Sequence, residues 1–180
     1  NAAIGLAASG TGAIPAFTAI NTGTAPVTAT ITVTPTFTNG GISCVGTVRT
    51  YTITINPTAT VNTVSNQVIC NGSASAAVNF STTATGGTVT YAWTNSNTTI
   101  GLSASGSGNI ASFTATNNGT APAIATITVT PTFTNDGVSC QGTAQTFTIT
   151  VNPTATVNAI SNQTVCNGAA VSAVNFATTA

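Results

Sequence analysis

The side chains in this sequence that could support covalent or acid–base chemistry are very few. There is one acidic residue, one basic residue and no histidine, whereas charged residues usually make up about 25% of a soluble chain. The reactive set is Asp136, Arg49 and four cysteines, Cys44, Cys70, Cys140 and Cys166. General acid–base catalysis needs a carboxylate pair, an imidazole or an amine near the substrate, and a serine or cysteine nucleophile needs a base to activate it. The sequence therefore predicts that the chain is not an enzyme and uses no cofactor.

These residues lie in a sequence that repeats itself. The stretch ITVTPTFTNGGISC at 31–44 returns as ITVTPTFTNDGVSC at 127–140, and an offset of 96 residues aligns 1–84 with 97–180 with 58 of the 84 pairs identical. An internal period of this size indicates the folding unit. We expect three segments: 1–57, the C-terminal part of one repeat; 58–153, a complete repeat; and 154–180, the N-terminal part of the next. The chain is then a window from a longer array.

The repeat also bears on the chemistry of the reactive residues. Asp136 corresponds to Gly40 in the other copy, and Arg49 corresponds to Gln145. Neither charge is therefore a feature of every repeat. Asp136 precedes Gly137, a pair typical of a tight turn. We expect Asp136 in a turn and Arg49 at a solvated strand position.

The cysteines occur twice in each period, in Gly-rich stretches without CxxC pairs or histidine, so no metal site is expected. Two cysteines per domain favour disulfides and an oxidising, extracellular setting. The pair within the complete repeat is Cys70 with Cys140, with Cys44 and Cys166 pairing in adjacent repeats; such a long closed loop contributes about 4 kcal/mol in the chain-entropy model. Two alternatives stay open: free buried thiols, or links between neighbouring repeats that join Cys44 to Cys70 and Cys140 to Cys166.

Threonine alternates with apolar residues along most of the chain, and turn signals separate the runs. This period of two predicts strands with one apolar face and one hydroxyl face. About seven short strands in 96 residues predict an all-β fold of tandem immunoglobulin-like β-sandwich domains. Pro35 and Pro131 interrupt otherwise good strands and predict a bulge, a kink or an exposed edge. The expected core is Val78, Phe80, Val89, Tyr91, Trp93, Phe113, Ile127, Val129, Phe147, Ile149 and Val151.

The composition excludes several kinds of partner. The formal net charge is zero, so electrostatic attraction to nucleic acid or to acidic lipid has no source. A membrane-spanning helix needs about 18 or more consecutive apolar residues, and Thr, Asn, Gly or Ser interrupts every apolar run here. We expect no nucleic-acid partner and no membrane span.

Several motifs in order, NPTATVNTVSNQVICNG, TYAWTNSN, ATITVTPTFTNDGVSCQGT and FTITVNP, carry a resemblance to a known family. The chain resembles the PKD-like, immunoglobulin-type tandem repeats of large secreted surface proteins of Bacteroidota. Such repeats form the stalks of adhesins, including gliding-motility adhesins exported by the type IX system. The PKD domain proper has a Trp-Asp-Phe-Gly-Asp-Gly-type stretch where this chain reads Tyr91-Ala92-Trp93-Thr94-Asn95-Ser96, so the resemblance implies no calcium site here.

The resemblance implies a structural segment of an extracellular adhesin or fibre on the bacterial cell surface. Its partners would be identical or near-identical neighbouring repeats in a self-associating fibre, because equal units present the same contact surface. The alternative is a module that binds a surface glycan through loops such as Ser103 to Asn109. A third interpretation, a repeat-bearing part of a secreted enzyme, requires a catalytic domain outside these residues.

Overall fold

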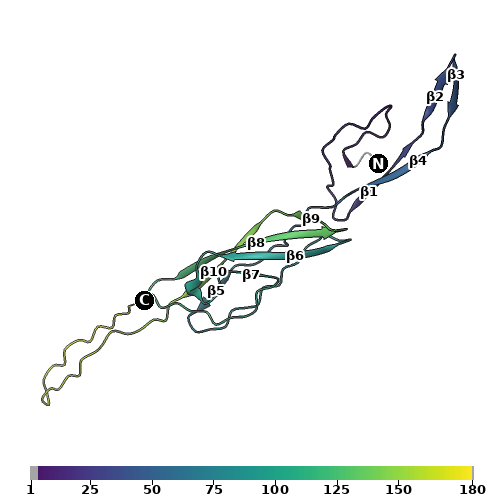
Figure 1. Ribbon diagram of the computed structural model, residues 1–180. Coiled ribbons are helices and arrows are strands. Elements are labelled where there is room, and N and C mark those ends of the chain that lie inside the picture. The colour runs from purple at the N-terminus through teal and green to yellow at the C-terminus, as the bar shows by residue number, and fades with distance from the viewer. Residues whose placement is uncertain (1–3, 180) are drawn as a thin grey trace. The chain divides into compact units, whose positions relative to one another are not determined.

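The computed structural model describes residues 4–179 and is an all-β fold, as the alternation predicts (Figure 1). The described residues form strands, loops and the short 3-10 helix η2 (Thr98–Ile100), and residues 4–179 contain no α-helix. The strands are β1 (Val27–Val33), β2 (Thr36–Asn39), β3 (Ile42–Val45), β4 (Arg49–Ile55), β5 (Gln67–Cys70), β6 (Thr88–Asn95), β7 (Ser105–Ser107), β8 (Ala123–Asn135), β9 (Val138–Gln141) and β10 (Gln145–Asn152).

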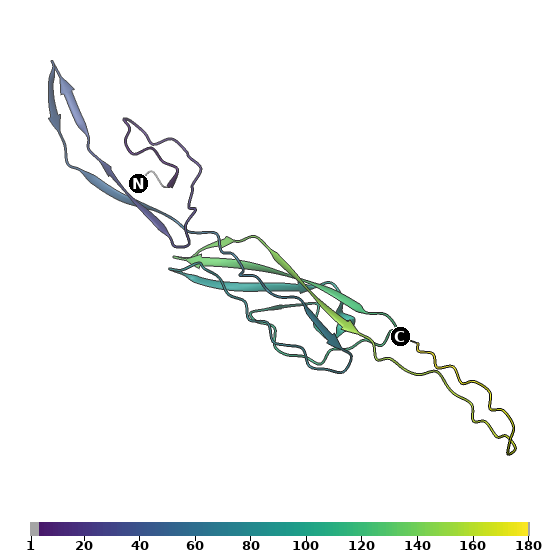
Figure 2. The same cartoon turned by 180° about the vertical axis from the view of Figure 1, so that it is seen from behind.

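The strands pair in three sheets. A six-stranded sheet has the order β5-β10-β8-β6-β7, and β9 pairs with β8 outside this order. Strands β1 and β4 form a two-stranded antiparallel sheet, and β2 and β3 form a hairpin, seen in Figure 2 at the purple-blue end of the chain. Only the pairing of β5 with β10 is parallel among the registers determined. The chain thus combines hairpins with one strand that joins a sheet edge from a distant part of the sequence.

The chain divides into two compact units that do not follow its linear order. Unit 1 comprises residues 1–62, 81–91 and 130–144. Unit 2 comprises residues 63–80, 92–129 and 145–180. The complete repeat expected at 58–153 contributes residues to both units.

The strand pattern recurs at the offset of the sequence repeat. In unit 1, β1 pairs with β4 from Val27↔Ile55 to Val33↔Arg49. In unit 2, the first part of β8 pairs with β10 from Ala123↔Val151 to Val129↔Gln145, and each of these residues lies 96 positions after its counterpart. The hairpin of β2 and β3 corresponds in the same way to the end of β8 and β9. Matching sequences therefore adopt matching registers.

Threonine explains how these sheets stay solvated with almost no charge. Along β10 the apolar residues Phe147, Ile149 and Val151 are buried, and the threonines between them are not. Threonine is β-branched and suits a strand, and its hydroxyl also bonds across strands. Thr28 and Thr54 join β1 to β4 with hydroxyl oxygens 2.9 Å apart. The six-stranded sheet therefore has an apolar inner face and a hydroxyl outer face, whereas all residues of the β2–β3 hairpin are exposed.

The expected core is largely buried. Eight of its eleven residues are buried, whereas Val89, Tyr91 and Phe113 are half-buried. The structure adds several buried side chains that the alternation did not single out, namely Ile100, Leu102, Ile110, Pro131 and Phe133. Ile100, Leu102 and Ile110 lie outside the strands, whereas Pro131 and Phe133 continue the alternation of β8.

The two prolines lie in different settings. Pro35 is exposed and lies between the end of β1 and the start of β2. Pro131, in contrast, is fully buried inside the continuous strand β8. It lies where β8 changes partner, because its residues up to Val129 pair with β10 and those from Thr132 pair with β9. Proline has no N–H for a ladder, and at a change of partner none is required.

Candidate functional site

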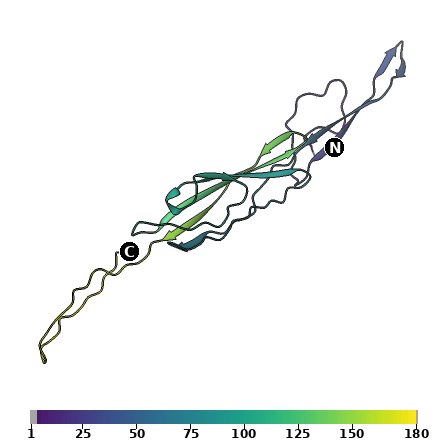
Figure 3. The same cartoon turned by 60° about the horizontal axis from the view of Figure 1, so that its bottom comes forward.

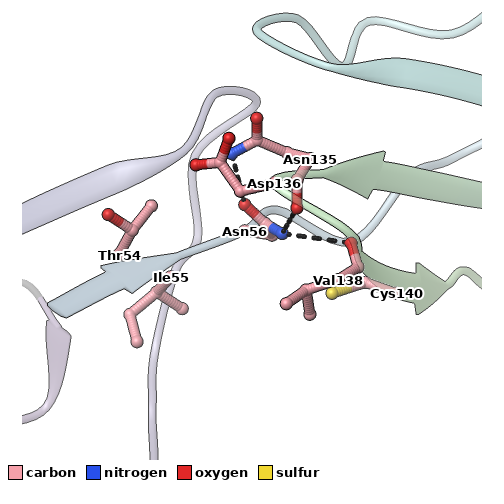
Figure 4. A pocket seen from close by; sticks show the side chains of 7 residues that line it. All are labelled: Thr54, Ile55, Asn56, Asn135, Asp136, Val138 and Cys140. Atoms are coloured by element: carbon pink, nitrogen blue, oxygen red, sulfur yellow. Dashed lines mark hydrogen bonds between the residues drawn. The ribbon is translucent and has the colours of Figure 1, made fainter.

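The largest concentration of the reactive residues lines a pocket in unit 1. The pocket holds about 260 Å³ and contains Asp136, Cys140 and an asparagine pair, Asn56 and Asn135 (Figure 4). These side chains come from the end of β4 and from the hairpin of β8 and β9. The hairpin positions Asp136 and Gly137 in a two-residue turn with φ of 49° and 74°. The predicted Asp-Gly turn is therefore confirmed, and its conformation leaves Asp136 exposed.

The side-chain amides of Asn56 and Asn135 bond to each other and to nearby backbone carbonyl oxygens. Asn135 Nδ2 donates to Asn56 Oδ1 at 3.0 Å, and Asn56 Nδ2 lies within bonding distance of the carbonyl oxygens of Asn135 at 3.3 Å and Val138 at 3.4 Å. The amides therefore tie the end of β4 to the β8–β9 turn. The pocket wall offers one carboxylate and one thiol besides these amides. It supplies no base adjacent to Cys140 and no second carboxylate beside Asp136 within its lining.

A second pocket, of about 300 Å³, lies in unit 2 and includes Gln67, Ala76 and Val78. The Gln67 side chain bonds to the backbone of Ala76, since Nε2 donates to Ala76 O at 3.1 Å and Oε1 accepts from Ala76 N at 3.1 Å. The amide is thus engaged by backbone. The remaining lining consists of neutral side chains. Gln67 therefore has a structural role in this pocket, because it joins β5 to the backbone of Ala76.

The predicted disulfide between Cys70 and Cys140 is not present, because all four cysteines are free thiols. Each of three cysteines lies in a strand opposite a residue that is not cysteine: Cys70 opposite Asn152, Cys140 opposite Phe133 and Cys44 opposite Phe37. A disulfide needs Cα atoms about 4.4–6.8 Å apart. The residue opposite each of these cysteines on the paired strand is not a cysteine. The alternative bonds of Cys44 with Cys70 and of Cys140 with Cys166 are likewise absent. The alternative of fully buried thiols is also wrong, since Cys44, Cys70 and Cys166 are exposed.

The aromatic residues that could have offered a sugar-binding face are turned inward. Trp93 is buried, and its indole packs against Gly106 of β7, where an added Cβ would lie 2.3 Å from Trp93 Cζ2. Tyr91 is half-buried, and desolvation raises the pKa of its phenol above the usual 10.0. The loop Ser103 to Asn109 contains β7, which pairs with β6. Part of the candidate glycan loop is therefore a strand that covers the tryptophan.

Buried asparagines are the polar residues that sequence reasoning missed. Asn117 Nδ2 donates to the carbonyl oxygens of Ala121 at 2.9 Å and Val151 at 2.7 Å, and its Oδ1 accepts from Gly119 N at 2.9 Å. Asn21 makes the same three contacts 96 residues earlier, to Ala25, Ile55 and Gly23. The recurrence of an Asn-x-Gly-Thr-Ala-Pro stretch in both copies was the available signal. Its role is to order the connection into β1 and β8.

No group of three or more His, Cys, Asp or Glu gathers as a metal site within residues 4–179. Over the same described range, no helix is long and apolar enough to cross a membrane. No protein-family model matches the chain, and no curated protein matches its sequence.

Proposed function

We propose that this chain is a structural repeat segment of an extracellular cell-surface adhesin or fibre, with no catalytic role. The observation that carries the proposal is the recurrence of one strand register and one set of asparagine contacts 96 residues apart. Repeats that fold alike stack as near-identical units, and the stability of the whole becomes a sum of unit and junction terms. Such an array supplies length and a repeated contact surface rather than a single reaction centre.

The surface chemistry supports the same role. Exposed sheet edges usually avoid edge-to-edge pairing through lysine or inward-pointing charge, and this chain has one Arg and one Asp in 180 residues. Its outer faces carry hydroxyl pairs such as Thr38 with Ser43 at 2.8 Å and Thr134 with Ser139 at 2.9 Å. A solvated but nearly uncharged surface permits close contact between neighbouring repeats. The partners in this proposal are therefore near-identical repeats.

The extracellular, bacterial location rests on the resemblance to PKD-like repeats of secreted surface proteins. The glycan-binding alternative gains no support from Trp93, which is buried beneath Gly106. The experiment that tests the proposal is immunogold labelling of intact producing cells with antibodies against the 180-residue chain. Regularly spaced label along surface fibres is the expected result. Label that appears only after the cells are permeabilised would overturn the proposal.

A further inference from the structure

The chain passes from the first repeat (residues 1–57) to the complete repeat without a free linker. Residues 56–62 continue from β4, which is drawn in blue in Figure 3. Their sequence, NPTATVN, has the polar and proline-containing composition of an exposed linker. In the structure, however, the apolar residues of this segment are buried, namely Pro57, Ala59 and Val61. The segment packs so closely that a Cβ on Gly142 would collide with the carbonyl oxygen of Ala59.

The two residues at this boundary are held from opposite sides. The carbonyl oxygen of Ile55 accepts a hydrogen bond from Asn21 Nδ2 at 2.8 Å, within the first repeat. The Asn56 side chain bonds to the complete repeat, where Asn135 Nδ2 donates to Asn56 Oδ1 at 3.0 Å (Figure 4). Asn56 Nδ2 also lies 3.3 and 3.4 Å from the carbonyl oxygens of Asn135 and Val138. The anchored residue of one repeat is therefore the direct neighbour of the residue anchored to the next.

The backbone at the boundary has little freedom of its own. Proline fixes φ at about −65°, and the residue before a proline is restricted to extended conformations. Asn56 and Pro57 are such a pair. At the other end of the segment, Asn62 N donates to Ser81 O at 2.8 Å, and Asn62 Nδ2 donates to Ser81 Oγ at 2.9 Å. The segment is thus bonded at both ends and stiff where it begins.

A second contact crosses the same boundary at a distance in sequence from residues 56–62. Thr85 N, in the complete repeat, donates to Thr24 O, in the first repeat, at 2.7 Å. Beside this bond, a Cβ on Gly86 would lie 2.7 Å from Pro26 Cδ, so the approach requires glycine. Two separate contacts fix an orientation that a single contact would leave free to rotate. All of these residues belong to unit 1.

We propose that the boundary between successive repeats is a fixed joint, locked by the amide pair of Asn56 and Asn135, which holds each repeat in one orientation on the next. Relative motion is the usual behaviour of domains joined by a linker, and this joint prevents it. Its residues recur in the sequence, because Asn152 and Pro122 match Asn56 and Pro26 at the offset of 96. The inference rests on the proposed function, since it specifies how the proposed array keeps its repeats aligned.

Distances between two spin labels across the boundary test the joint. All four native cysteines are replaced by serine, and labels are attached at Thr52→Cys in β4 and Thr90→Cys in β6, both exposed positions of unit 1. Double electron–electron resonance then gives the distribution of the label-to-label distance. We expect one narrow distribution for this chain. A reference chain with Gly-Gly-Ser inserted after Asn56 should give a distribution about threefold broader, because such linkers are flexible.

The Asn56→Ala and Asn135→Ala variants test the amide pair itself. Each removes the bond between the two side chains, so we expect a distribution about twofold broader than that of the labelled parent chain. Asn152→Ala is the matched control, because at this counterpart position the backbone carbonyl oxygen accepts from Asn71 N at 2.9 Å. It should leave the distribution unchanged. Emission from the buried Trp93 monitors the fold of the complete repeat in every variant.

Two results would overturn the fixed joint. One is a distribution in the labelled parent chain as broad as that of the Gly-Gly-Ser chain. The other is a distribution for Asn56→Ala and Asn135→Ala as narrow as that of the parent, since the amide pair would then not lock the joint. Either result leaves the surface-fibre role standing, because immunogold labelling tests that role separately.

Discussion

Phe80 and Phe147 pack with their ring centroids 6.4 Å apart and their planes inclined by 59°, which joins the segment before β6 to strand β10. Both rings are buried. The same sequence, Val-Asn-Phe, recurs at 174–176 with its phenylalanine exposed. The chain therefore contains this phenylalanine once in a buried position and once in an exposed position.

The Phe80→Ala variant should lose about 3–5 kcal/mol of unfolding free energy, because truncation of a buried phenylalanine removes transfer energy and leaves a cavity. Urea denaturation followed by Trp93 fluorescence measures this change. The control is Phe176→Ala, measured at low protein concentration, for which we expect a change within about 0.5 kcal/mol. Equal losses for the two variants would contradict the packing described here.

The Asn117→Asp variant should destabilise the fold by about 3 kcal/mol or more at neutral pH. The substitution replaces the amide donor with a carboxylate that faces the carbonyl oxygens of Ala121 and Val151 at 2.9 and 2.7 Å. Those oxygens and burial raise the pKa of the new carboxyl in the folded state, so the loss should shrink as pH falls and the group becomes protonated. Denaturation at several pH values checks both points. Asn21→Asp, at the half-buried counterpart, should cost less.

The Gly106→Ala variant should cost about 1–3 kcal/mol by overpacking. A methyl group there would approach Trp93 Cζ2 to 2.3 Å and Cε2 to 2.6 Å, so β7 or the indole must shift. We expect a changed Trp93 emission maximum together with the loss of stability. Gly10→Ala is the control in the other copy, since no atom lies within 4 Å of the added methyl. An unchanged emission maximum for Gly106→Ala would argue against the buried indole.

Tyr91 should make the fold less stable at high pH. Burial raises the pKa of this phenol above 10.0, so the unfolded chain releases the proton first as pH rises. The folded state then binds more protons than the unfolded state, and its stability is complete below pH 10 and declines above it. Thermal unfolding between pH 8 and 12 should show a shallower decline for Tyr91→Phe than for the native chain. Identical slopes would count against a desolvated phenol.

The strand pattern could be predicted from the sequence because threonine alternation specifies both the strand and its inward face. Phe147, Ile149 and Val151 illustrate this, since each is both predicted and found in the core. Phe133 continues the same alternation, at positions 127, 129, 131 and 133. What the sequence could not show is that the strand continues through Pro131, because only the change of strand partner at that point removes the need for a proline N–H.

The candidate site was less predictable, because it depends on which segments meet. The prediction of a Cys70–Cys140 bond was based on both cysteines lying in the complete repeat, whereas the cross-strand partners of these residues are Asn152 and Phe133. Residues 163–166 repeat the β5 sequence and still form no strand. A strand requires a partner edge as well as a suitable sequence. The asparagine contacts of Asn56 and Asn117 depend on tertiary structure for the same reason.

Electron microscopy of the native, undenatured material tests the central claim, a fibre of repeated β units, most directly. Strand β8 is 13 residues long, and a strand advances about 3.4 Å per residue, so a unit should advance the fibre by about 35–45 Å. The account predicts continuous fibres with that axial repeat, or with twice that repeat. Isolated particles of one or two units, with no axial periodicity, would contradict it.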